Sequence, residues 1–174
     1  MSHLWRLGKR TARLRGLRAL AARVPVAVLS GHRRESFAGE AELRAALPPG
    51  AALAFHDTTE IPAAAWPGLF RSGAFHVQWT DPQSIESGAP WRMFETAAAG
   101  TPLLSDARPG YPALFAPEKE IFYAPDEAAL AERAAALLGG PPELLRETGA
   151  AARRAFLERH TWEARWRQIE RQIP

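Results

Sequence analysis

Residues 88–106 read GAPWRMFETAAAGTPLLSD, and they decide the fold because they predict one helix and one strand with clear ends. Pro90 suits the first turn of a helix, where its missing N–H is not needed, and Gly100 suits the left-handed residue that closes one. The residues between them are mostly apolar or small, so we predict a short helix largely packed inside the protein. Residues 101–106 predict a buried strand that ends in polar residues.

Arg92 and Glu95 are the charged exceptions in this helix, and their spacing of three places them on one face. One interpretation is a salt bridge on a solvated strip. The other is that both face a ligand, because the start of this helix and the end of the next strand would flank one crevice. In open α/β sheets, ligands bind outside the carboxyl ends of the strands.

The rest of the chain predicts strands alternating with helices. Val24 to Ser30 is a β-branched run that ends at Gly31, and Asp126 and Thr161 are N-caps of later helices. We expect strands at 24–30, 51–56, 75–79, 101–106 and 120–123, and helices at 40–47, 61–72, 90–99, 111–115, 126–138, 142–159 and 161–172. This alternation predicts an α/β fold, a doubly wound, Rossmann-like parallel sheet of about five strands with helices on both faces.

The composition is that of a soluble globular protein, with 174 residues, 47% of them hydrophobic and 24% charged. Cysteine is absent, which excludes disulfides, thiolate metal sites and a thiol nucleophile. No apolar run is long enough to span a membrane, and the N-terminus has no secretory signal, so we expect a cytoplasmic protein. The length predicts a single domain, with a first helix at 1–23 and a Rossmann-like part at 24–174.

The basic residues are unevenly placed. Residues 1–34 hold nine of them and no acidic one, whereas the remainder has 13 basic against 19 acidic residues. Leu7, Leu14 and Leu17 share one face of a predicted amphipathic helix over 3–22. Such a helix suits contact with an anionic membrane surface, and a cytoplasmic protein could then be peripheral at the membrane. The alternative is that the leucines pack on the domain and the arginines are solvated. We predict no nucleic-acid partner.

Several short motifs follow one another in a set order along the chain. Arg92-Met-Phe-Glu95, Gly100-Thr-Pro-Leu-Leu-Ser-Asp106, Lys119-Glu120 and Arg159-His160-Thr161 occur in this order. From about residue 75 to 169 the sequence resembles the carboxyl-terminal domain of group 1 glycosyltransferases of the GT-B type. It is most similar to the spore-maturation-protein-B-like branch, with its R-x-F-E-x-x-A-x-G-T core.

The resemblance implies that this domain binds a nucleotide-diphosphate sugar as substrate. Glu95 matches the second glutamate of the family's E-x7-E motif, which accepts hydrogen bonds from the ribose hydroxyls. Arg92, at the helix start, suits the diphosphate. Gly100 and Thr101 complete the matched core as donor-binding residues.

We add Gly31 and Arg33 to the predicted donor-binding residues, because they follow a strand, where phosphates often bind. The family's first glutamate falls at Ser87, which departs from the pattern, so no sugar-contacting carboxylate is predicted. The catalytic residues therefore stay unknown.

No D-x-D motif or cluster with metal-ligand spacing is present, so we predict no metal and no cofactor besides the donor substrate. The family's acceptor-binding amino-terminal domain has no counterpart in the sequence. We therefore expect this chain to be inactive alone and to need such a domain as a partner. The alternative is a non-catalytic nucleotide-binding or interaction module that docks through its basic N-terminal helix.

Overall fold

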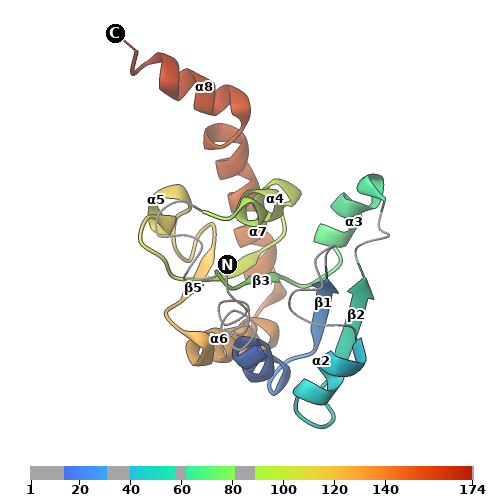
Figure 1. The fold of residues 1–174 in the computed structure, drawn as a ribbon. Coiled ribbons are helices and arrows are strands. Elements are labelled where there is room, and N and C mark those ends of the chain that lie inside the picture. Colours follow the sequence, from blue (N-terminus) through green and yellow to red (C-terminus); the bar gives the residue numbers. More distant parts are fainter. Residues whose placement is uncertain (1–13, 31–39, 58–61, 81–88, 174) are drawn as a thin grey trace, which may run out of the picture. The chain divides into compact units, whose positions relative to one another are not determined.

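A computed structural model describes residues 14–30, 40–57, 62–80 and 89–173 (Figure 1). Helices and parallel strands alternate along the chain, so the predicted Rossmann-like α/β class is confirmed. The chain divides into two compact units, residues 1–66 with 124–140 and residues 67–123 with 141–174. They are described separately below.

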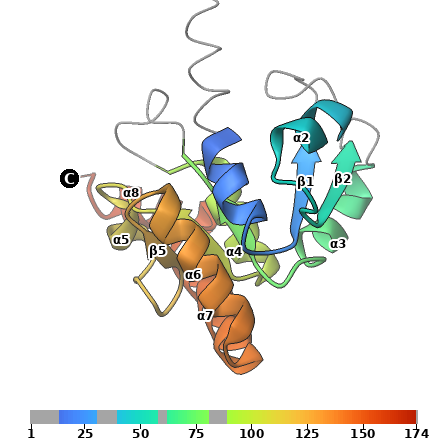
Figure 2. The same ribbon diagram turned by 90° about the horizontal axis from the view of Figure 1, so that it is seen from below.

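In the first unit, β1 (Val26–Ser30) and β2 (Leu53–Asp57) form a parallel pair with Val26 opposite Leu53, and the two arrows point the same way in Figure 1. Between them in the sequence lies α2 (Glu40–Ala46). Residues 14–21 are helical (Figure 2). Leu14, Leu17 and Ala21 pack in a cluster with Leu43 and Leu47. The described part of the predicted basic helix therefore uses its leucines for packing, while Leu7 lies outside the described residues.

The first unit also contains η2 (Ala63–Ala65) and α6 (Glu127–Gly139). Asp126 caps α6 by accepting a hydrogen bond from the Ala129 N–H, as the sequence predicts. Arg15 and Arg23, from the basic N-terminal region, form ion pairs with Glu127 and Glu132 of α6. These pairs are exposed, so each adds little to stability.

In the second unit, β3 (His76–Gln78), β4 (Leu103–Asp106) and β5 (Phe122–Ala124) form a sheet in that order. The pair β3 and β4 is parallel, with His76 opposite Leu103 and Gln78 opposite Ser105. The described strands thus form two sheets, of two and three strands, where we expected one continuous sheet of about five. Strand β3 has only three residues and pairs with β4.

Helix α4 (Trp91–Ala99) connects β3 to β4 and ends as predicted, with Gly100 in the left-handed conformation at φ 74°. Pro90 lies one residue before the first turn, as the N-cap. Met93 and Ala97 belong to the main core, together with Leu103, Tyr111, Phe115, Ile121, Ala152 and Ala155. The helix is less buried than we expected, because Trp91 at its start is 66% exposed and the packing is concentrated farther along.

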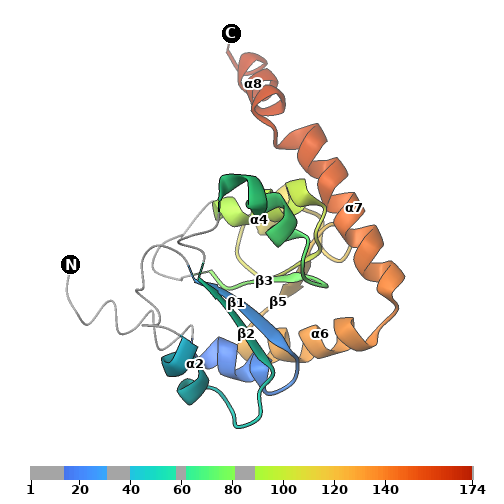
Figure 3. The ribbon, with the colours of Figure 1, turned by 90° about the vertical axis from the view of Figure 1, so that its right-hand side faces the viewer.

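The remaining helices are α3 (Trp66–Phe70), α5 (Tyr111–Leu114), α7 (Pro142–Arg159) and α8 (Trp162–Glu170). Helix α7 packs along α4, and α8 continues outward from the end of α7 (Figure 3). Thr161 caps α8 by accepting a hydrogen bond from the Ala164 N–H, as predicted.

Candidate functional site

The start of α4 presents Arg92 and Glu95 at the surface. Met93 and Ala97 point into the core, so residues on the other side of the helix are turned outward, and both charged side chains are exposed. Within the described chain, no ion pair or hydrogen bond joins Arg92 to Glu95, and neither pairs with another residue. The salt bridge considered as the first interpretation is therefore not formed in this structure. Both groups can take a ligand as partner.

The other end of α4 is held by protein contacts. The Gly100 N–H donates to the carbonyl of Ala97, and the Thr101 hydroxyl donates to the Phe70 carbonyl at 2.6 Å. Helix α7 approaches so closely that a Cβ on Gly149 would lie 2.3 Å from the Gly100 carbonyl oxygen. Gly100 and Thr101 thus stand apart from Arg92, and their contact with a donor remains a prediction.

A buried polar network lies at the carboxyl ends of β3 and β4. The Thr80 backbone N–H and hydroxyl both donate to Asp106 Oδ1, at 3.0 and 2.8 Å. Because the hydroxyl proton of Thr80 is used in this way, the Tyr111 hydroxyl donates to Thr80 Oγ1 at 2.8 Å. Arg108 completes the network, with Nε donating to Asp106 Oδ2 at 2.8 Å and Nη2 donating to the Thr80 carbonyl at 3.1 Å.

Sequence reasoning expected polar residues at this strand end but missed Arg108. The signal that could have found it is an arginine two residues beyond an aspartate that ends a buried strand. Asp106 is only 2% exposed, so its charge requires a cation nearby. Burial raises the pKa of Tyr111, and its hydroxyl is protonated and able to donate at neutral pH.

His76 lies beneath α4, with Nδ1 3.4 Å from the Thr96 hydroxyl and its ring against Phe70. Burial lowers the pKa of His76, and the Arg92 guanidinium lowers it further. The imidazole is therefore neutral at pH 7. Its pKa also responds to the charge at Arg92, so it can report on what binds there.

The motif residues Glu120, Arg159 and His160 serve the fold. Glu120 is almost buried, pairs with Arg159 and accepts the Ala116 N–H at 2.8 Å. His160 Nε2 donates to the Leu114 carbonyl at 2.9 Å, because a carbonyl can only accept. Burial, with Arg165 and Arg159, lowers the pKa of His160. This cluster ties the end of α7 to α5 and to the turn before β5.

Two further predictions concern the residues that follow β1 and the binding of a metal ion. Gly31 and Arg33 lie outside the described residues. No group of three or more histidine, aspartate or glutamate side chains within the described ranges could hold a metal ion.

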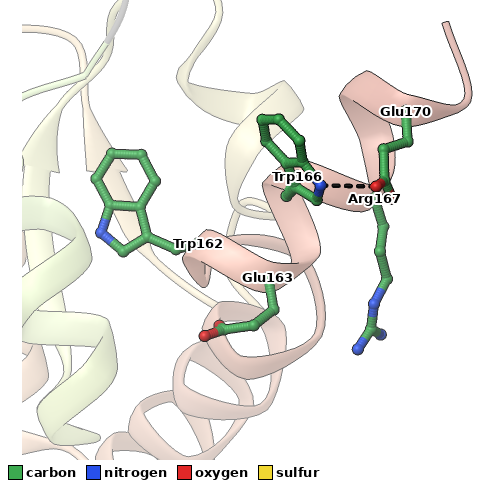
Figure 4. A pocket seen from close by; sticks show the side chains of 5 residues that line it. All are labelled: Trp162, Glu163, Trp166, Arg167 and Glu170. Carbon is green, nitrogen blue, oxygen red and sulfur yellow. Dashed lines mark hydrogen bonds between the residues drawn. The ribbon is translucent and has the colours of Figure 1, made fainter. Parts of the chain in front are cut away.

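A surface hollow lies along α8, and Arg92, Glu95, Gly100 and Thr101 are not among the residues that line it (Figure 4). Its lining consists of Trp162, Glu163, Trp166, Arg167 and Glu170. The Trp166 indole N–H donates to Glu170 at 2.7 Å, and the other side chains project outward from one helix (Figure 4). Because the hollow is open and a single helix forms it, it lacks the convergent polar groups of a binding site. The start of α4 and the adjoining strand ends remain the candidate site.

The comparisons with known proteins assign this α/β fold to a class. Residues 27–171 match the family described as glycosyl transferase-like. This match covers most of the sequence, so the chain belongs to the glycosyl transferase-like family. No curated protein sequence matches the chain significantly.

Among solved structures, the chain is similar to a sucrose-phosphate synthase from Thermosynechococcus elongatus, with a TM-score of 0.68 and 22% identity. The match covers 94% of this chain and 43% of that one, so the chain spans less than half the length of the synthase. At this identity the likeness supports the fold. Among the described helices, none combines the length and apolar character needed to cross a membrane.

Proposed function

We propose that this chain is the donor-binding half of a GT-B glycosyltransferase and holds a nucleotide-diphosphate sugar at the start of α4. The observation that carries the proposal is the exposed pair Arg92 and Glu95, which has no partner within the described chain. The pair lies on a well-packed helix of a glycosyl transferase-like protein. Charged groups fixed on a rigid element and left unpaired are suited to a polar ligand.

Arg92 and Glu95 would bind different parts of the donor. The Glu95 carboxylate can accept hydrogen bonds from both hydroxyls of a ribose cis-diol. The Arg92 guanidinium, in the first turn of α4, can pair with the diphosphate. Charge on the departing nucleoside diphosphate would then be neutralised without a divalent ion.

The proposed transfer reaction also requires a site for the acceptor. We propose that an acceptor-binding amino-terminal domain supplies the other wall of the cleft, and that the isolated chain does not transfer sugar. Membership of the spore-maturation-protein-B-like branch remains our prediction. Gly31, Arg33, Gly100 and Thr101 each remain a predicted donor-binding residue. A cytoplasmic location, with contact to an anionic membrane surface through the basic helix, is part of the same proposal.

A second candidate function is nucleotide binding without transfer. Ser87 stands where the resembled family has its first glutamate, and its hydroxyl cannot act as a carboxylate. Such a module would bind the donor nucleotide and show no transfer even when joined to an acceptor domain.

Calorimetric titration tests the proposal. Uridine, adenosine and guanosine diphosphates are titrated into the wild-type chain and into Glu95→Gln, which keeps the size of the side chain but loses its charge. We expect one nucleotide to bind and Glu95→Gln to weaken it by about 1.5 to 3 kcal/mol, the range for a hydrogen bond to a charged group.

The matched control is Glu163→Gln, the same change at an exposed glutamate on α8, which should bind like the wild type. Equal affinities for wild type, Glu95→Gln and Glu163→Gln would refute the role of Glu95. Absence of binding by any nucleoside diphosphate would refute the donor site.

A further inference from the structure

Arg108 is fixed at two points at the edge where β3 and β4 end. Its Nε is held by the buried Asp106 carboxylate and its Nη2 by the Thr80 carbonyl. These two anchors come from the ends of two adjacent parallel strands, so the plane of the guanidinium is set by the sheet itself. A guanidinium held in this way loses little conformational entropy when it binds a ligand.

The same guanidinium keeps unused donors. It carries five N–H groups, and two of them are occupied by Asp106 and Thr80. The remaining three have no partner within the described chain, and the side chain is 27% exposed. Arg108 therefore has free donors that solvent, or a ligand, can reach.

A role as simple counter-charge to Asp106 does not account for all of this geometry. The carboxylate already accepts two hydrogen bonds from Thr80 on Oδ1. A lysine would neutralise the remaining charge equally well as a point charge. What only arginine offers is a planar edge of paired N–H groups, which matches the oxygens of a phosphate. The carboxyl edge of parallel strands is also where ligands bind in this fold class.

We propose that Arg108 is a diphosphate-binding residue, positioned by Asp106 and Thr80, and that it adds a second guanidinium to the donor site. The inference rests on the proposed function for the nature of the ligand. Asp106 is its positioning residue, because it acts only through the orientation of Arg108.

The test uses inorganic pyrophosphate and the nucleoside diphosphate that binds best, each titrated into the full chain. Arg108→Lys keeps a cation beside Asp106 but removes the planar guanidinium. We therefore expect about tenfold weaker binding of both ligands. Binding of the bare nucleoside should not change. Asp106→Asn weakens one of the two contacts that hold the Arg108 guanidinium, and it should give a smaller loss of affinity for both ligands. Arg153→Lys, a change at an arginine that also donates to a backbone carbonyl, is the control and should bind like the wild type.

Thermal melting of each variant separates folding from binding. A lower melting temperature of Arg108→Lys with unchanged pyrophosphate affinity would overturn the inference and leave Arg108 as the counter-charge of Asp106. If pyrophosphate binds through Arg108 while the nucleoside diphosphate binds no more tightly, Arg108 is a phosphate-binding residue and the proposed donor function fails. If the nucleoside diphosphate binds and is indifferent to Arg108, the donor function stands and the inference fails.

Discussion

The two ends of α4 differ in what holds them. At the start, Arg92 and Glu95 are exposed and no described residue pairs with them. At the end, Gly100 is covered by Gly149, and Arg153 Nη1 donates to the Ala98 carbonyl at 2.8 Å. A single sequence motif spans both ends, so belonging to the motif does not by itself assign a residue to the ligand.

The two ends of α4 should therefore differ in whether a substitution changes stability or ligand binding. The residues at the end of α4 satisfy backbone groups and allow α7 to approach, so changes there should affect folding. The charged residues at the start contribute little to packing, so changes there should affect binding. Variants at the two ends therefore give opposite patterns of stability and affinity.

The largest effect is expected from Gly149→Ala. The new methyl carbon would lie 2.3 Å from the Gly100 carbonyl oxygen and 3.2 Å from Pro102 Cδ, so α7 must move away from α4. Alanine favours helix by about 1 kcal/mol over glycine, but forced overpacking costs about 1 to 3 kcal/mol or more. We predict a net loss of about 2 kcal/mol in the free energy of unfolding, measured by urea denaturation. Ala150→Gly, at an exposed position on the same turn, is the control and measures the difference in helix propensity alone. A stabilised Gly149→Ala would show that this end of α4 is loosely held.

Arg153→Ala should have a smaller effect at the same end. It removes the hydrogen bond to the Ala98 carbonyl, which belongs to the last turn of α4. A cationic donor to a terminal helix carbonyl in an exposed position contributes about 1 kcal/mol, so we expect a loss of that size in urea denaturation. Nucleotide affinity should stay unchanged. A loss of affinity equal to that of Arg92→Ala would erase the distinction between the ends.

The pKa of His76 offers the smallest and most local test. Burial and Arg92 hold it below 6.5, so the unfolded chain takes up the proton more readily than the folded one. The stability linked to His76 is therefore complete above about pH 6.5 and falls as the pH drops below that value. In Arg92→Ala the pKa should rise while staying below 6.5, because burial remains. NMR titration of the His76 ring measures this, and an unchanged pKa would place Arg92 too far from His76 to influence it.

Much of this fold could be predicted from local sequence signals. Pro90 and Gly100 mark the ends of α4, and the buried run at 103–106 forms β4. Which strands pair could not be predicted, because strand pairing depends on contacts between residues far apart in the sequence.

The candidate site was predicted less completely. Arg92 and Glu95 were recognisable as charges on an apolar helix, whereas the packing of Gly100 depends on Gly149, which lies 49 positions away in the sequence. Arg108 was missed because its role comes from Thr80 and Asp106, which are brought together only by the pairing of two strands.

The central claim is that the start of α4 binds the diphosphate of a nucleotide donor. Titration of a nucleoside and its diphosphate into Arg92→Ala tests it most directly. The control is Arg153→Ala, a change at an arginine of α7 that donates to the last turn of α4. We predict that Arg92→Ala weakens the diphosphate by about tenfold or more, leaves the nucleoside unchanged and melts like the wild type at pH 7. Equal affinities of Arg92→Ala, Arg153→Ala and wild type for both ligands would contradict the claim.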